Sequence, residues 1–163
     1  MTLPAIIFPK KFTKNGNKLK GFFEPSQFNR INSSDHKLIG KVELDICFYQ
    51  ESGIKICVEG SSVCVMRFVC QRCLNYFDQE LHLDINAVLI EDHLASEDKK
   101  HDNEEWILEE GELNILKALE DELLLMMPIS PLHGLDECEH DTMSKILEAG
   151  NSNNSPFQVL RKF

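Results

Sequence analysis

Apolar and polar residues alternate with a period of two along the middle of the chain, beginning near residue 40. The stretch GKVELDICFY at 40–49 places four apolar side chains on one face: Val42, Leu44, Ile46 and Phe48. GIKICVEG at 53–60 and FDQELHLDINAVLI at 77–90 repeat this alternation, and SSVCVMRFVC at 61–70 is nearly continuously apolar. Such periodicity is typical of strands with one buried face.

Short polar stretches separate these segments and favour direct connections between neighbouring strands. QESG at 50–53 is one predicted turn, and the residues Glu59, Gly60, Ser61 and Ser62 are predicted to form another. Because short turns join antiparallel neighbours, the pattern predicts four antiparallel strands in a meander.

The period changes to that of a helix at ILKALEDELLLMM, residues 115–127. Asn114 is a good N-cap, and Pro128 stops the helix. One apolar stripe runs along it through Ile115, Leu119, Leu123 and Met126, whereas the acids Glu120, Asp121 and Glu122 are expected to face solvent. WILEEGELN, just before it, is expected to include a short strand.

These patterns predict an α+β fold, in which an antiparallel meander or partly closed sheet packs with one main amphipathic helix. Prolines and glycines interrupt residues 1–39, so this basic region is expected to be irregular, with short elements such as a short helix near Ser26. We divide the chain into this region packed on the core, a core domain at 40–141, and a tail at 142–163 with a docking-like peptide. Residues 91–105 are charged and aperiodic, which predicts a solvated loop.

Composition points to a cytoplasmic globular protein with an uneven charge. The net charge is −10, yet residues 1–42 carry eight Lys and Arg against two acids, and residues 74–127 carry sixteen acids against three lysines. This distribution favours an oriented encounter with a charged partner. No segment of the sequence resembles a signal peptide or a membrane span, and in a reducing compartment the six cysteines are not expected to form disulfides.

The sequence CQRC places Cys70 and Cys73 at the end of the predicted third strand. Two thiols at this spacing suit half of a zinc site, a redox pair, or packed hydrophobic residues. A redox pair usually begins a helix, which lowers the thiol pKa, whereas this pair ends a strand; Arg72 between the thiols still keeps that alternative open. Cys47, Cys57 and Cys64 alternate within strands and are expected to be packed thiols.

A second concentration of donors follows the helix in SPLHGLDECEH. Its His133 and Cys138 would complete a Cys3His zinc site with Cys70 and Cys73, with His140 as a substitute fourth ligand. Such a metal would be structural, because no coordination position stays open. Nucleophile-elbow, P-loop and dinucleotide-binding motifs are all absent from the sequence, so an enzyme is not expected.

Three segments in this order, CQRCLNYF, GELNILKALEDELLLMMPISPLHGLDEC and the terminal SPFQVLRKF, resemble the YceD family of large ribosomal RNA subunit accumulation proteins. The resemblance covers most of the chain from about residue 40. It implies a bacterial cytoplasmic, non-enzymatic factor that supports synthesis, processing or stability of 23S rRNA. Its motif positions fall on Cys70, Cys73, His133 and Cys138, which is consistent with one joint site.

The expected partners are pre-ribosomal RNA or large-subunit ribosomal proteins, and no membrane. In the first case the N-terminal lysines would approach phosphates while the acidic middle orients the contact. A thiol redox protein using Cys70 and Cys73, and an adaptor that docks through PFQVLRKF, are the alternatives from other classes.

Overall fold

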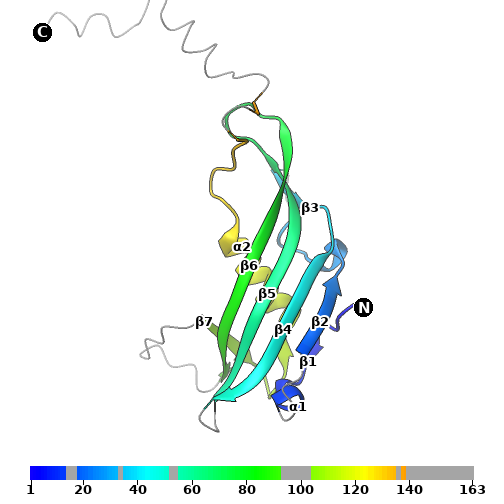
Figure 1. The fold of residues 1–163 in the computed structure, drawn as a ribbon, viewed down its shortest axis with the longest axis vertical. Coiled ribbons are helices and arrows are strands. Elements are labelled where there is room, and N and C mark those ends of the chain that lie inside the picture. Colours follow the sequence, from blue (N-terminus) through cyan, green and yellow to red (C-terminus); the bar gives the residue numbers. More distant parts are fainter. Residues whose placement is uncertain (14–17, 33–34, 52–54, 93–103, 135–136, 139–163) are drawn as a thin grey trace, which may run out of the picture. The chain divides into compact units, whose positions relative to one another are not determined.

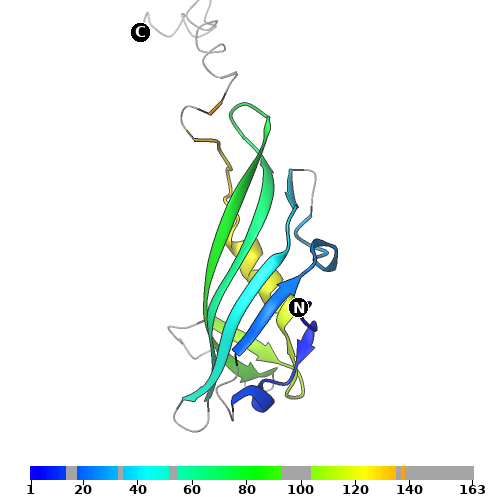
Figure 2. The ribbon, with the colours of Figure 1, turned by 45° about the vertical axis from the view of Figure 1, so that its right-hand side comes forward.

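The computed structural model of the chain describes residues 1–13, 18–32, 35–51, 55–92, 104–134 and 137–138. Its elements follow in the order β1 (Ile6–Ile7), α1 (Pro9–Thr13), β2 (Lys18–Phe23), the 3-10 helix η1 (Pro25–Gln27), β3 (His36–Leu38), β4 (Val42–Glu51), β5 (Lys55–Val69), β6 (Tyr76–Glu91), β7 (Glu104–Leu108), β8 (Leu113–Asn114) and α2 (Ile115–Met126). The α+β class is confirmed, with one main helix lying along one face of the sheet (Figures 1 and 2).

The chain divides into two compact units. The larger contains Met1–Arg67 and Asp78–Met127, and the smaller contains Phe68–Phe77 together with the chain from Pro128 onward. Almost all of the secondary structure belongs to the larger unit. The predicted division at residues 39 and 141 stays a prediction, and the tail lies outside the described residues.

The main sheet of the larger unit has the strand order β2-β4-β5-β6-β7, and β3 pairs with β5. The alternation of apolar residues predicted this sheet because one face is buried. Buried side chains on that face include Val42, Leu44, Ile46 and Phe48 from β4, and Leu81, Leu83 and Ile85 from β6. The helix adds Ile115, Leu119 and Leu123 to the core.

Strand β5 corrects one sequence-based prediction. The expected turn at residues 59–62 does not exist, because β5 continues through it and pairs with β4 in one regular antiparallel register from Val63 opposite Glu43 to Lys55 opposite Glu51. Gly60 lies opposite Ile46, and a Cβ atom there would overlap the carbonyl oxygen of Asp45. Glycine therefore permits a close approach of two backbones here, and does not mark a turn.

The far end of the sheet is a second difference from the meander. Strand β7 runs parallel to β6, with Ala87 opposite Glu104 and Glu91 opposite Leu108. The sequence before α2 does form a short strand, as expected, but periodicity carries no information on strand direction. A separate two-stranded sheet joins β1 to β8, with Ile6 opposite Asn114.

The N-terminal region contains only short elements, as its prolines and glycines predict. Nevertheless, β2 forms a full ladder with β4, from Lys18 opposite Cys47 to Phe23 opposite Val42. Phe23 and Phe28 are both fully buried and meet edge to face, with ring centroids 6.1 Å apart. This region therefore contributes both an edge strand and core side chains.

Helix α2 begins as predicted, with the Asn114 side chain accepting a hydrogen bond from the backbone N–H of Lys117 at 3.0 Å. Two of its three acids, Glu120 and Glu122, correct the expectation of a solvated face, whereas Asp121 is 47% exposed. Glu120 is buried, where it accepts hydrogen bonds from the backbone N–H and the Nε of Arg30 at 2.7 and 2.9 Å. Glu122 accepts one from the indole N–H of Trp106. A charged residue next to an apolar stripe is thus buried because it has partners.

Candidate metal centre

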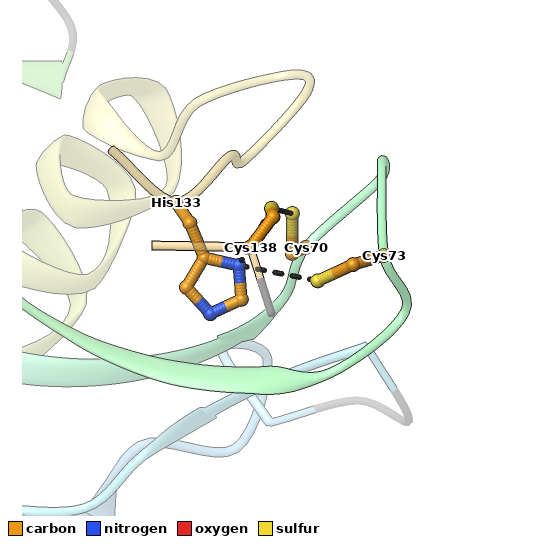
Figure 3. Close-up of side chains that lie close together, drawn as sticks. All are labelled: Cys70, Cys73, His133 and Cys138. Carbon is orange, nitrogen blue, oxygen red and sulfur yellow. Dashed lines mark hydrogen bonds between the residues drawn. The ribbon is translucent and has the colours of Figure 1, made fainter. Parts of the chain in front are cut away.

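The first pair of cysteines lies in a tight turn between β5 and β6, within the smaller unit. The N–H of Leu74 donates to the carbonyl oxygen of Cys70, and the N–H of Cys70 donates to the carbonyl oxygen of Asn75, each at 2.9 Å. Leu74 has a φ of 62°, the left-handed conformation that closes the turn. The chain therefore folds back within a few residues and brings the two sulfur atoms to the same side (Figure 3).

The second pair lies on the segment after α2. Pro128 cannot continue the helix, and the extended chain that follows is hydrogen bonded to the turn through the N–H of Gln71, which donates to the carbonyl oxygen of Pro131 at 2.9 Å. A local turn is then held by Gly134, whose N–H donates to the Glu137 carboxylate at 3.1 Å. This turn places Cys138 back beside His133.

Cys70, Cys73, His133 and Cys138 meet in one group, which we call the Cys3His cluster. Their ligand atoms all lie within 4.8 Å of one another. The Sγ atoms of Cys70 and Cys138 are 3.8 Å apart, and the Nδ1 of His133 lies 3.3 Å from the Sγ of Cys73 and 3.5 Å from that of Cys138 (Figure 3). Three thiols and one imidazole at these separations form a group that can hold a metal ion.

The surroundings of the Cys3His cluster act on its thiols in opposite directions. Burial of Cys70 opposes ionisation, but hydrogen bonds from the backbone of His133, Cys73 and Arg72 and from the His133 side chain outweigh it and lower the pKa of this thiol to about 5. For Cys138, burial raises the pKa; the Arg72 guanidinium opposes this, the sulfurs of Cys73 and Cys70 add to it, and the net pKa is raised. In such a group the Cys70 thiol ionises most easily, and a bound cation would favour ionisation of the other thiols.

Arg72 contacts the Cys3His cluster directly. Its Nε and Nη2 donate to the Sγ of Cys138 at 3.1 and 3.0 Å, and Nη2 also donates to the carbonyl oxygen of Gly134 at 3.1 Å. The sequence suggested that Arg72 stabilises a thiolate of its own Cys-x-x-Cys pair. In the structure its thiol partner in these contacts is Cys138, a choice that depends on tertiary placement.

Aromatic rings support the imidazole. The ring of Phe77 packs against that of His133, with centroids 4.7 Å apart, and Phe68 packs against Phe77 at 6.0 Å. All three residues belong to the smaller unit. The histidine is therefore held by packing as well as by its polar neighbours.

The remaining thiols are in the places that the alternation predicted. Cys57 and Cys64 are buried in β5, and Cys47 is half-buried in β4. Burial raises the pKa of the Cys64 thiol to about 11, which is the behaviour of a packed thiol. His140, the substitute ligand suggested by the sequence, lies outside the described residues.

The fold and the Cys3His cluster together define an α+β protein with one group of three thiols and an imidazole that could hold a metal ion. The family model for "Large ribosomal RNA subunit accumulation protein YceD" matches residues 58–163, so the chain belongs to the YceD family. The expected resemblance is thereby confirmed.

A similar curated protein is the large ribosomal RNA subunit accumulation protein YceD of Haemophilus influenzae. It is 23% identical over 163 residues, a match that covers 97% of this chain and 94% of that protein. No solved structure matches the chain. Among the described residues, no helix is both long and apolar enough to cross a membrane.

Proposed function

We propose that the Cys3His cluster holds one structural zinc ion. Ligand atoms about 2.0–2.3 Å from a tetrahedral zinc lie roughly 3.5–3.8 Å from one another. Three separations within the cluster, 3.8, 3.3 and 3.5 Å, are close to this value, and all four ligand atoms lie within 4.8 Å of one another. This convergence of four ligand atoms is the observation that supports the proposal.

Zinc would supply the link between two segments that are far apart in the sequence. Cys70 and Cys73 would bind it from the turn after β5, and His133 and Cys138 would bind it from the chain after α2. Because four protein ligands complete a tetrahedron, no position is left for a substrate or water. Three thiolates on one dication leave a net negative charge, which the guanidinium of Arg72 would offset at Cys138.

Elemental analysis of the untagged protein tests the metal directly. We expect one zinc per chain, which is lost in Cys70→Ser and in Cys138→Ser but kept in the matched control Cys47→Ser, whose thiol lies outside the cluster. A strong chelator should lower Tm of the wild type and leave the two metal-free variants unaffected. Six freely titrating thiols and no metal in freshly purified protein would contradict the proposal.

At the level of the cell, we propose that this chain is a non-enzymatic ribosome-biogenesis factor that supports the accumulation of 23S rRNA of the large subunit. Membership of the YceD family and the description of the Haemophilus influenzae relative support this role. A cluster without an open ligand position supports binding over catalysis. The role requires a cytoplasmic location, where pre-ribosomal RNA and newly made ribosomal proteins are present.

The test is the ratio of 23S to 16S rRNA in the source bacterium after deletion of the gene. Deletion should lower the ratio, and the wild-type gene should restore it. We expect the double variant Cys70→Ser/Cys138→Ser to restore it poorly and Cys47→Ser to restore it fully, at equal protein levels. An unchanged ratio in the deletion strain would contradict the ribosomal role. It would not affect the metal proposal, which is tested separately by elemental analysis.

A thiol redox function is the second candidate, because the pKa of Cys70 is lowered to about 5 and Cys138 lies 3.8 Å away. However, Cys70 is fully buried, so a substrate disulfide has no access to its sulfur. A metal ligand also has to be a thiolate, but it does not need to be accessible to a substrate, so the buried Cys70 suits this role better. Insulin reduction that exceeds the activity of Cys70→Ser/Cys73→Ser would favour the redox function over zinc.

The charges of the described residues bear on the choice between RNA and protein partners. Three lysines within residues 1–42 already have carboxylate partners: Lys20 with Asp45 at 2.8 Å, Lys10 with Glu91 at 3.4 Å, and Lys41 with Glu24 at 3.6 Å. Each pair reduces the positive potential available to phosphates. This supports a protein partner ahead of direct RNA contact.

A further inference from the structure

A groove of about 350 Å³ lies in the larger unit between the edge strand β7, strand β8 and helix α2. Ile6 from β1, Trp106 and Ile107 from β7, and Leu125 from α2 are among the residues that line it. All of these elements belong to one compact unit, so the groove is a feature of a single folded body.

The apolar part of the groove is unusually exposed. Leu125 is 83% exposed, Ile6 is 50% exposed and Ile107 is 40% exposed. Trp106 is buried beneath them, and its indole N–H is already satisfied by the carboxylate of Glu122 at 3.0 Å. Large apolar side chains that share one groove and stay in water are typical of a surface that another molecule covers.

The rim of the groove is acidic. Glu105, Glu109, Glu112, Asp121 and Glu122 line it together with a single cationic side chain, Lys117. Among the described residues, the carboxylates of Glu109 and Glu112 have no cation beside them, whereas Asp121 pairs with Arg30 at 2.6 Å.

A second hollow continues this acidic rim. It shares Glu109 and Glu112 with the groove and adds Glu91, Asp92 and Glu110. Near the groove, burial and then the charge of Glu122 raise the pKa of Glu104, as expected where negative charges gather. The two hollows form one negatively charged face with an apolar centre.

We infer that this groove binds a basic segment of another protein, with apolar side chains in the groove and Lys or Arg side chains on the rim. Charge complementarity selects this occupant, because the same carboxylates repel nucleic acid phosphates. The apolar centre supplies the burial that charge alone does not. The inference names the partner chemistry for the ribosomal role proposed above, but the groove itself needs neither zinc nor RNA.

A fluorescently labelled synthetic peptide of ten residues that alternates isoleucine and lysine is a suitable probe. Its binding to the full chain is measured by fluorescence anisotropy. We expect binding that weakens as salt rises, since exposed charge pairs are screened. Glu109→Lys/Glu112→Lys should raise the Kd about tenfold, and Leu125→Ser should raise it severalfold. Both changes affect exposed or half-exposed side chains and should leave the fold intact.

Matched controls separate a specific groove from general charge attraction. Glu43→Lys/Glu59→Lys changes the net charge by the same amount, on β4 and β5. Ile129→Ser removes an apolar side chain that is even more exposed than Leu125. Both controls should bind the peptide within about twofold of wild type. Equal weakening by the control pair, or equal binding of a serine-lysine peptide, would overturn the inference.

Three further outcomes would also overturn it. A single-stranded RNA oligomer that binds more tightly than the peptide and displaces it from the groove would place the partner in the wrong class. Self-association in the ultracentrifuge that Leu125→Ser abolishes would make a second copy the occupant. A change in the rRNA ratio without peptide binding would reject the groove while keeping the ribosomal role.

Discussion

The side chain of Glu120 is only 9% exposed, and its carboxylate accepts hydrogen bonds from two donors of one residue, Arg30. The backbone N–H and the guanidinium Nε each donate to a different oxygen of this carboxylate. One side chain on α2 thereby fixes both the main chain and the side chain of the segment that follows η1. The arrangement ties residues ninety positions apart in the sequence.

We expect Glu120→Ala to lower the free energy of unfolding by about 2 kcal/mol, because two hydrogen bonds to a charged, buried acceptor are lost. Urea denaturation followed by circular dichroism measures the change. Asp121→Asn is the matched control: Asp121 also contacts Arg30, but both side chains are 47% exposed and such pairs contribute little. Equal losses in the two variants would show that burial of Glu120 does not matter.

At the scale of elements, β5 shows why one strand was predicted as two. The sequence around Gly60 contains glycine and two serines, which is the composition of a turn. In the structure Ser62 lies on the buried side and donates its hydroxyl to the carbonyl oxygen of Glu43 at 2.8 Å, so its polarity is satisfied within the sheet. Composition does not report whether a polar residue has a partner on the next strand.

Gly60→Ala should therefore destabilise the protein by at least about 2 kcal/mol, because the new Cβ would overlap backbone atoms of β4. Thermal unfolding followed by calorimetry measures the effect. Gly40→Ala is the control, since a Cβ at Gly40 would meet only the Val65 side chain, at an ordinary 3.7 Å. Stability unchanged in Gly60→Ala would mean that β4 and β5 separate more easily than their register implies.

Other elements followed from the sequence more completely. The N-cap at Asn114 and the stop at Pro128 are local signals, so the limits of α2 were predictable. The parallel pairing of β6 with β7 was not, because it depends on how the chain returns between them. The groove was missed for a related reason: the helical period leaves Leu125 off the buried stripe, but it does not show that β7 and β8 lie beside that exposed side chain.

At the scale of the whole molecule, the two units differ in the interactions that can stabilise each of them. The larger unit contains the sheet, the helix and most of the buried side chains. The described part of the smaller unit has few buried apolar groups, among them Phe68, Cys70 and Cys73. A short segment with so little core needs a cross-link or a metal for stability.

Chelation should accordingly raise hydrogen exchange in residues 68–77 and 128–138 while β4 and α2 stay protected. Mass spectrometry of exchanged peptides measures this difference region by region. The metal-free variant Cys138→Ser should show the raised exchange without chelator, and Cys47→Ser should not. A uniform rise across both units would mean that the metal, if bound, stabilises the entire fold.

The candidate site was predicted better than the topology. Cys-x-x-Cys and the donors after the helix identified four residues that do cluster, because few cysteines and histidines lie outside the strands and the acidic loop. The contact of Arg72 with Cys138 was beyond reach, since it depends on the turn around Gly134. The candidate ligands are thus recognisable from local sequence, whereas the groups that contact them depend on the folded chain.

The pairing of β1 with β8 also governs when the chain can finish folding. Ile6 lies opposite Asn114, so these strands meet only after more than a hundred residues between them have been synthesised. The hairpins of β4, β5 and β6 join near neighbours and are free to form earlier on the ribosome. Strand β1 is therefore among the last strands to be paired, although residues 1–3 just before it bond to Phe22 of β2 and need not wait for β8.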